Sequence, residues 1–339
     1  DARYGSEDFT RESAEILSGA GLKVSVLPRP LPTPVLAHAV KKLNAHVGIM
    51  VTASHNPPMD NGYKVYLNAD VDGIKYQGSQ IITPTDKLIS AEIDKITSLK
   101  SQPRANNWND LDDSVFDDYV KRTALIGKTP GKLKIVYTAM HGVGFETIEA
   151  VFKKAGFNAP ILVEEQVKPD PDFPTVAFPN PEEPGAIDLS LTKAKTVGAD
   201  LVIANDPDAD RCAAAINDPK HGWRMLKGDE IGILLGDWIA RTNSGNYGNS
   251  IVSSSGLSKI CKHYGRNFRE TLTGFKYLAQ IPNLAFAYEE AIGYSVDSAT
   301  VSDKDGVSAA IALAQLAEEL AANGQTIHDR LQEIWKLIG

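Results

Sequence analysis

A serine followed by a histidine, at the end of an apolar run, is the first pair of side chains in this sequence that could do covalent chemistry. Ser54 and His55 lie in the stretch VTASHNP (51–57), which follows the small and β-branched residues of 47–51. That run predicts a buried parallel strand, closed by prolines. Open α/β sheets place ligands at the carboxyl ends of their strands. Ser54 is therefore a candidate nucleophile, although a serine hydroxyl is a weak one and needs activation.

A second group of chemically useful side chains follows another apolar run. Asp206, Asp208 and Asp210 alternate in the sequence DPDADR, which ends at Arg211. Alternate carboxylates on a loop can turn oxygen ligands toward one point, which suits a hard cation such as Mg²⁺, and Arg211 can bind a phosphate there. A solvated acidic turn is the alternative. An EF-hand does not fit, because its sixth and twelfth positions would be Arg211 and Asn217.

Composition limits the classes of protein to consider. The chain has 339 residues, 42% hydrophobic and 23% charged, which is enough for two or three domains. A net charge of −8 argues against nucleic acid or an anionic membrane as the main partner. Cys212 and Cys261 are the two cysteines, which fits a reducing compartment, and no apolar run approaches eighteen residues. We expect a cytoplasmic protein, a monomer or weak dimer, whose partners are small anionic molecules.

The elements that must position these residues alternate between strands and helices, which predicts three α/β lobes with parallel or mixed sheets. We place the lobes at residues 1–125, 126–247 and 248–339. The predicted strands are 23–27, 47–51, 63–67, 134–138, 161–163, 201–204, 250–253, 268–272 and 285–288. The predicted helices are 9–20, 33–43, 116–125, 144–152, 187–196, 257–264, 307–322 and 331–339. Gly142 and Gly144 do not complete a GxGxxG dinucleotide loop.

Four motifs in one order carry a family resemblance. They are TASHNP with NGYK (52–57 and 61–64), DPDADR (206–211), GFKY (274–277) and EEAIG (289–293). Together they resemble the α-D-phosphohexomutase family, the phosphoglucomutases and phosphomannomutases. The resemblance implies that the first lobe carries a phosphoserine, the second binds the metal and the third binds the sugar.

The resemblance also implies a role for each matching residue. Asp206, Asp208, Asp210 and the phosphate on Ser54 would share a Mg²⁺ ion. Arg3, in DARYGS, resembles the family's arginine beside the phosphoserine, and Lys64 its lysine near the transferred phosphoryl group. Without the resemblance, Lys64 would be assigned to the surface of a strand. Arg211 adds positive charge, and either His55 or Lys64 could transfer the proton.

The sugar-binding motifs fit the family less closely. Gly274, Phe275 and Lys276 resemble the turn that grips the sugar phosphate, while Glu289, Ala291 and Gly293 resemble the turn that accepts hydrogen bonds from sugar hydroxyls. The first turn of a helix is another place for Glu289 and Glu290. Many members carry serine where this chain has Ala291, and the EEAIG form is similar to a branch that includes phosphopentomutase-type enzymes. The identity of the sugar therefore stays open.

The resemblance implies two pieces that this sequence does not contain. They are a glycine-rich segment before DAR (1–3) and a fourth lobe with an Arg-Ser-Gly-Thr phosphate-binding loop. We accordingly expect the 339-residue chain by itself to turn over poorly.

The expected reaction moves a phosphoryl group between the C1 and C6 (or C5) hydroxyls of a sugar monophosphate, through phosphorylated Ser54 and a sugar 1,6-bisphosphate. A phosphopentomutase and a non-catalytic sugar-phosphate-binding relative are alternatives. A serine hydrolase using Ser54 and His55 is a third, but the sequence around Ser54 lacks the GxSxG elbow.

Overall fold

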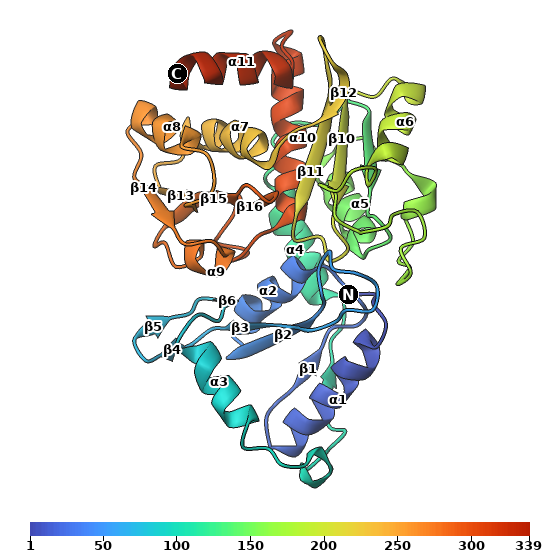
Figure 1. The fold of residues 1–339 in the computed structure, drawn as a ribbon, viewed down its shortest axis with the longest axis vertical. Coiled ribbons are helices and arrows are strands. Elements are labelled where there is room, and N and C mark those ends of the chain that lie inside the picture. Colours follow the sequence, from blue (N-terminus) through green and yellow to red (C-terminus); the bar gives the residue numbers. More distant parts are fainter.

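The computed structural model describes all of residues 1–339 and consists of three α/β lobes (Figure 1). The expected fold class is thus confirmed. The lower lobe in Figure 1, blue to cyan, contains the N-terminal third of the chain. Its elements are α1 (Ser6–Gly19), β1 (Ser25–Val26), α2 (Thr33–Lys42), β2 (Val47–Val51), β3 (Tyr63–Leu67), β4 (Asp70–Val71), β5 (Ile74–Lys75), β6 (Ser79–Gln80), α3 (Thr85–Ile93) and β7 (Asn109–Asp110), followed by α4 (Ser114–Ala124) at the junction of the lobes.

The strand that leads to Ser54 forms as predicted, but its pairing differs. β2 pairs with β3 in an antiparallel register from Val47 opposite Leu67 to Val51 opposite Tyr63, and β6 continues the sheet. The expected parallel pairing is therefore wrong for β2. The chain returns from β2 to β3 through a short loop, whereas parallel strands need a crossover connection of a dozen or more residues.

The second lobe holds a five-stranded mixed sheet in the order β12-β11-β10-β8-β9. β8 lies between β9 and β10, parallel to both, whereas β11 is antiparallel to β10 and β12. Its elements are β8 (Ile135–Thr138), α5 (Gly144–Ala155), β9 (Ile161–Leu162), α6 (Asp188–Val197), β10 (Leu201–Asn205), β11 (Cys212–Asp218) and β12 (Gly222–Met225). Because β10 is fully buried, the loop after it is anchored in the core.

The third lobe holds the sheet β14-β13-β15-β16. Its elements are α7 (Gly228–Ala240), β13 (Asn246–Ser250), α8 (Gly256–Tyr264), β14 (Phe268–Thr271), α9 (Phe275–Leu278), β15 (Leu284–Glu289), β16 (Gly293–Ser295), α10 (Gly306–Ala322) and α11 (Ile327–Ile338). The strand predicted at 250–253 is displaced to 246–250. Ile251 and Val252 lie in a turn, 58% and 59% exposed, so their β-branched side chains mark no strand there.

One boundary between lobes also differs from the expectation. The boundary at 247/248 assigns α7 to the second lobe, but α7 packs against β15 and α8 of the third. The segment 212–240, for which the sequence pattern predicts no element, contains β11, β12 and α7.

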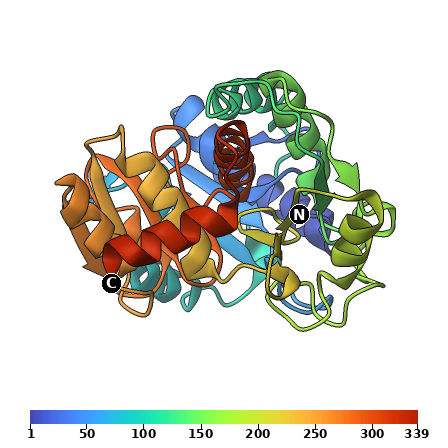
Figure 2. The same ribbon diagram turned by 90° about the horizontal axis from the view of Figure 1, so that it is seen from above.

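Helix α10 joins the two upper lobes and confirms the expected scaffold helix at 307–322 (Figure 1). It contacts α5 and β10 on one side and α7 and β16 on the other, and the two lobes lie side by side when seen from above (Figure 2). A single cluster of 60 buried apolar residues includes members of all three lobes, so the lobes share one core. No helix is both long and apolar enough to cross a bilayer.

Candidate active site

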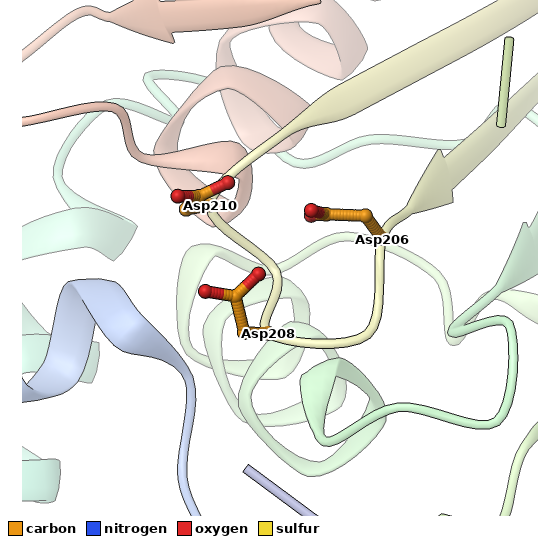
Figure 3. Close-up of side chains that lie close together, drawn as sticks. All are labelled: Asp206, Asp208 and Asp210. Atoms are coloured by element: carbon orange, nitrogen blue, oxygen red, sulfur yellow. The ribbon is translucent and has the colours of Figure 1, made fainter. Parts of the chain in front are cut away.

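The loop after β10 brings the predicted aspartates together. Asp206, Asp208 and Asp210 are completely buried, and one oxygen from each lies within 4.8 Å of the others (Figure 3). The turn that aims all three inward passes through Ala209 at a φ of 53°, in the left-handed region. A solvated acidic turn is excluded by this burial.

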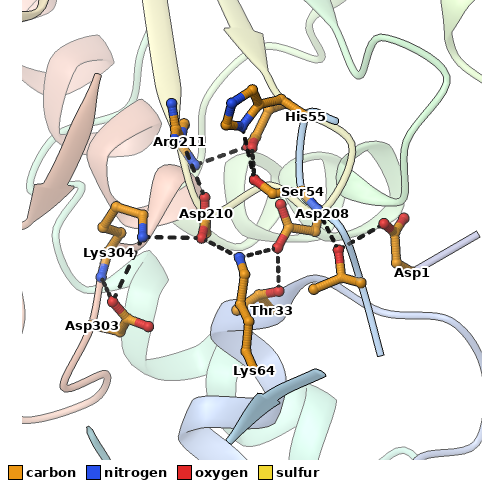
Figure 4. A network of polar contacts seen from close by, with 12 residues as sticks. Asp1, Thr33, Ser54, His55, Lys64, Asp208, Asp210, Arg211, Asp303 and Lys304 are labelled. Atoms are coloured by element: carbon orange, nitrogen blue, oxygen red, sulfur yellow. Dashed lines mark hydrogen bonds and ion pairs between the residues drawn. The ribbon is translucent and has the colours of Figure 1, made fainter. Parts of the chain in front are cut away.

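Ser54 reaches this cluster from the first lobe. Its Oγ donates to Asp206 Oδ2 at 2.8 Å and lies 3.2 Å from His55 Nδ1 (Figure 4). The Ser54 backbone is left-handed, with a φ of 53°, and its N–H donates to Thr52 Oγ1 at 2.8 Å. The sequence-distant serine and aspartates therefore form one site.

Two lysines face the carboxylates. Lys64 Nζ lies 2.6 Å from Asp208 Oδ2 and 2.6 Å from Asp210 Oδ2, and Lys304 Nζ lies 3.3 Å from Asp210 Oδ2. Lys64 is thus not a surface residue, since its side chain is 18% exposed. Sequence reasoning missed Lys304, and no local signal could have identified it, because it stands in a loop of the third lobe and only the fold brings it to the aspartates.

The two candidates for proton transfer have opposite protonation. Burial, with the nearby charge of Arg211, lowers the pKa of His55 to about 4, so its imidazole is neutral at pH 7. Burial alone would lower the pKa of Lys64, but Asp208 and Asp210 outweigh it and raise that pKa. In this arrangement the Ser54 hydroxyl proton points to Asp206 Oδ2, neutral His55 lies within reach of Ser54 Oγ as a second acceptor, and Lys64 remains a cation.

Arg3 contacts the backbone of the serine loop. Its two Nη atoms donate to four carbonyl oxygens, those of Ser54, Asn56, Pro57 and Asp60, at 2.7 to 3.1 Å. Nε donates to Asp1 Oδ2 at 3.1 Å, and the residue is 4% exposed. Arg3 is thus beside Ser54 as expected, but its donors shape the loop and none is aimed at Ser54 Oγ.

The aspartates fit a metal ion on two observations. Asp208 Oδ1 and Asp210 Oδ1 are buried and have no hydrogen-bond partner in the protein. Burial and the neighbouring charges of Asp208 and Asp210 raise the pKa of Asp206, and a cation placed between the three carboxylates would oppose this rise. Buried oxygens without partners are costly, and a divalent cation with oxygen ligands would satisfy them.

Arg211 borders the same space. Its Nε is buried without a hydrogen-bond partner and lies 3.9 Å from Asp210 Oδ1. Three cationic side chains, those of Lys64, Lys304 and Arg211, therefore surround three carboxylates. An anion that enters beside a divalent cation would meet this unused guanidinium donor.

The predicted sugar turns lie in the third lobe. Glu289 Oε1 accepts from Gly274 N at 2.6 Å, which joins the two turns. Phe275 is buried beneath Lys304, whose Nζ lies 5.8 Å from the ring centre, and Lys276 Nζ lies over the ring of Tyr277. The Glu289–Gly293 segment is a connection between β15 and β16, not the first turn of a helix.

A cavity of about 410 Å³ borders these turns. It lies between the lobes and is lined by Glu182, Met225, Leu226, Lys227, Gly228, Asp229 and Glu290. Ala291 offers no side-chain polar group, and Glu290 Oε2 already accepts from Ser250 and Ser253 at 2.9 and 3.0 Å. Gly293 forms an isolated antiparallel bridge with Arg211, so the predicted sugar turn is attached to the loop of the three aspartates.

Comparisons with known proteins agree with this arrangement. Three family models match: phosphoglucomutase/phosphomannomutase alpha/beta/alpha domain I over residues 1–100, domain II over 116–222 and domain III over 227–338. A probable phosphomannomutase of Haemophilus influenzae is 48% identical over 345 residues, which cover 100% of this chain and 70% of that protein.

Two further relatives extend the comparison. Human phosphopentomutase is 38% identical over 368 residues, which cover 97% of this chain and 58% of that protein, so the chain spans little more than half of its length. The crystal structure of a putative phosphomannomutase from Thermus thermophilus superposes with a TM-score of 0.80 at 24% identity, over 100% of this chain and 74% of that one, and shows the shared fold. On the domain matches and the Haemophilus relative, this chain belongs to the phosphoglucomutase/phosphomannomutase family.

Proposed function

We propose that this chain carries the phosphoserine, metal and sugar sites of a phosphosugar mutase of the phosphoglucomutase or phosphomannomutase type. The observation that supports the proposal best is the hydrogen bond from Ser54 Oγ to buried Asp206. This bond lies in a cluster of three carboxylates and three cationic side chains. A hydroxyl held there can carry a phosphoryl group whose charge the site balances.

In the first half of the reaction, phosphorylated Ser54 donates its phosphoryl group to a free hydroxyl of a sugar monophosphate. The Ser54 Oγ–P bond breaks, a bond from phosphorus to the sugar oxygen forms, and the sugar hydroxyl proton passes to the departing Ser54 Oγ. In the second half, the bisphosphate has reversed its orientation in the site, and Ser54 Oγ attacks its other phosphoryl group. With Asp206 holding the metal, neutral His55, 3.2 Å from Oγ, would accept the serine proton at that step and return it to the sugar oxygen released from phosphorus.

The cations act through charge and position. Asp206, Asp208 and Asp210 would hold Mg²⁺, which would supply charge stabilisation to the transferring group. Lys64 Nζ donates to Oδ2 of Asp208 and to Oδ2 of Asp210. The Oδ1 atoms of both residues are left without a hydrogen-bond partner. Arg211 has a free donor for the phosphoryl oxygens. We therefore assign Lys64 to charge balance and His55 to proton transfer.

The sugar turn bears on which sugar phosphate the site takes. Ala291 removes a hydroxyl contact from this turn, and the chain is 38% identical to human phosphopentomutase, which supports a pentose phosphate as the second candidate. A sugar 1,6-bisphosphate, or its pentose analogue, would be both intermediate and activator. Buried, unpaired Cys212 and Cys261 support a reducing compartment.

Phosphorylation of Ser54 tests the proposal directly. Protein treated with Mg²⁺ and glucose 1,6-bisphosphate is expected to gain one phosphate by intact mass, and Ser54→Ala is expected to gain none. Ser101→Ala, which removes an exposed serine of the same lobe away from the site, is the matched control and should be phosphorylated normally. A wild-type protein that stays unmodified with both hexose and pentose bisphosphates would sink the proposal.

A substrate panel separates the alternatives. Because this chain is expected to turn over poorly, the readout is a single transfer: loss of the Ser54 phosphate to glucose 1-phosphate, mannose 1-phosphate or ribose 1-phosphate identifies the sugar, and retention of the phosphate with all three favours a non-catalytic relative. A serine hydrolase would instead label with a fluorophosphonate probe. The structure gives that alternative little support, because Ser54 donates to Asp206 and no carboxylate contacts His55.

A further inference from the structure

The loop that carries the three aspartates connects the antiparallel strands β10 and β11, which pair Asn205 with Cys212, and a side chain with no charge of its own adds a hydrogen bond across it. Asn205, the last residue of β10, is fully buried. Its Nδ2 donates to the carbonyl oxygen of Arg211 at 2.6 Å, across the six residues from one end of the loop to the other. The bond turns residues 205–211 into a ring with Asp206, Asp208 and Asp210 on its inside.

The orientation of this amide is fixed from below. Asn205 Oδ1 accepts from the hydroxyl of Tyr137, on the adjacent strand β8, at 3.0 Å. Because the carbonyl of Arg211 can only accept, the NH₂ side of the amide must face it, and the Tyr137 hydroxyl donates to the remaining carbonyl side. Gly306, at the start of α10, closes the space above: a Cβ there would lie 2.2 Å from Arg211 O and 2.7 Å from Asn205 Nδ2.

The closed loop has a cost that the clasp, the bond from Asn205 to Arg211 O, must offset. Three buried carboxylates within 4.8 Å repel one another when no cation lies between them, and this repulsion favours an open loop. Lys64 and Lys304 offset part of the repulsion, but they bind only Asp208 and Asp210. The β10–β11 pairing joins the ends of the loop, and the Asn205 clasp additionally fixes the Arg211 carbonyl at the last turn of the loop, whether or not a cation is present.

We infer that Asn205 is a positioning residue that preorganises the aspartate loop for its divalent cation. It touches none of the three carboxylates, so it acts through the backbone of Arg211 and not as a ligand. Arg211 is also bridged to Gly293, and Cys212 N donates to Ile292 O at 3.1 Å. The peptide that the clasp holds is thus the one that attaches the sugar turn to the metal loop.

Magnesium binding tests the inference without any catalytic step. We would titrate MgCl₂ alone into the metal-free chain by isothermal titration calorimetry and compare wild type with Asn205→Ala. Groups that hydrogen-bond metal ligands directly typically contribute about 10- to 100-fold in affinity, and because Asn205 acts one step further away, through the backbone, the Kd for Mg²⁺ is expected to rise by about 10-fold, the lower end of that range. Circular dichroism and the unfolding midpoint establish that each variant is folded.

Asn205→Asp gives an opposite-sign test against simple electrostatics. The added carboxylate would strengthen cation binding if charge alone mattered. In its ionised form, the form that adds charge, it cannot donate to Arg211 O, so the clasp predicts weaker binding instead. If Asn205→Asp does not fold, Tyr137→Phe serves, because it removes only the hydroxyl that orients the amide and should raise the Kd by a smaller factor.

Asn249→Ala is the matched control. Asn249 is also a buried asparagine on a parallel strand, 1% exposed, and its Nδ2 donates to the carbonyl of Ser254 at 2.8 Å, but in the third lobe. Its Kd for Mg²⁺ should equal that of wild type, and a weakening as large as that of Asn205→Ala would assign the effect to general loosening and overturn the inference.

The inference rests on the proposed metal site, and the outcomes separate the two. If Asn205→Ala binds Mg²⁺ as tightly as wild type, the clasp is overturned and the metal site stands. If the wild-type chain binds no Mg²⁺, the metal site is overturned and the clasp with it. Tighter binding by Asn205→Asp would also overturn the clasp.

Discussion

At the scale of single residues, the same kind of side chain serves different purposes in this site. Lys64, Lys304 and Arg211 face carboxylates, whereas Arg3 places its donors on the backbone carbonyls of the serine loop. An arginine can do this because its guanidinium presents five donors in a rigid plane. Arg3 therefore sets the shape of the loop on which Ser54 stands.

Replacing Arg3 tests this role. Arg3→Lys keeps the charge but has three donors on a flexible stem, so several of the four carbonyls lose their partner. We expect the free energy of unfolding to fall by about 2 kcal/mol, the value of one or two charged hydrogen bonds. Urea denaturation measures it. Arg11→Lys, at an exposed pair with Asp8, is the control, and an equal loss in both variants would contradict the role.

At the scale of elements, the site depends on where helices and strands begin and end. Asp305 is the N-cap of α10, directly before its first residue. Its Oδ1 accepts hydrogen bonds from Val307 N and Ser308 N at 3.0 and 2.9 Å, and from the hydroxyl of Tyr119 at 2.8 Å. The next residue, Gly306, lies against the end of the aspartate loop. The cap therefore fixes α10 where it closes over the site.

The cap has a pH dependence with a defined sign. Burial, against the hydrogen bonds from Ser308 and Tyr119, raises the pKa of Asp305 to about 6, above its ordinary value near 4. Between pH 4 and 6 the folded state therefore holds more protons at this carboxyl than the unfolded state. Its contribution to stability is complete below pH 4 and decreases as the pH rises through 6.

Two substitutions at Asp305 separate the cap from the charge. Asp305→Asn keeps the side-chain oxygen and cannot ionise. The unfolding free energy of this variant should therefore not show the decrease between pH 4 and 6 that Asp305 causes in the wild type. Asp305→Ala removes the cap and leaves Tyr119 without its acceptor, and should cost about 2 to 3 kcal/mol at pH 5. Chemical denaturation at pH 4, 5, 6 and 7 measures both, and an unchanged pH profile in Asp305→Asn would contradict the assignment.

At the scale of the whole molecule, the site exists only where the three lobes meet. Ser54 and Lys64 come from the first lobe, the aspartates from the second and Lys304 from the third. The loop 297–305 of the third lobe is attached to the first by several bonds. In one of them, Tyr66 donates to buried Asp303 at 2.7 Å.

Removing that bond should loosen one lobe from another. Tyr66→Phe leaves Asp303 Oδ2 with Gln80 as its remaining side-chain donor and is expected to cost about 1 to 2 kcal/mol. Hydrogen exchange should increase in 297–305. Tyr76→Phe is the control, since its hydroxyl bonds only to Thr85 and to the backbone of Ile82, within the first lobe. Unchanged exchange at 297–305 in Tyr66→Phe would contradict this coupling.

Much of the local structure follows from the sequence. Strand 63–67 forms where its alternation predicts, and the apolar strand before Asp206 ends one residue beyond the predicted end. The prediction of a strand at 250–253 was wrong because β-branched residues also occur in exposed turns, as at Ile251 and Val252. The predicted parallel pairing of β2 was wrong because an apolar run fits a parallel or an antiparallel neighbour equally well.

The sequence by itself determined the chemical groups of the site and, through four ordered motifs, the family. Ser54 and the three aspartates could be named because their types, spacing and flanking strands are local properties of the chain. Only the tertiary structure decided which groups act on them. Lys304 joins Asp210 across the lobes, Arg3 turns to the backbone, and Asn205 reaches the carbonyl of Arg211. Burial depends on the packing of all three lobes, and it lowers the pKa of His55. Burial would also lower the pKa of Lys64, but Asp208 and Asp210 raise it and keep this lysine charged.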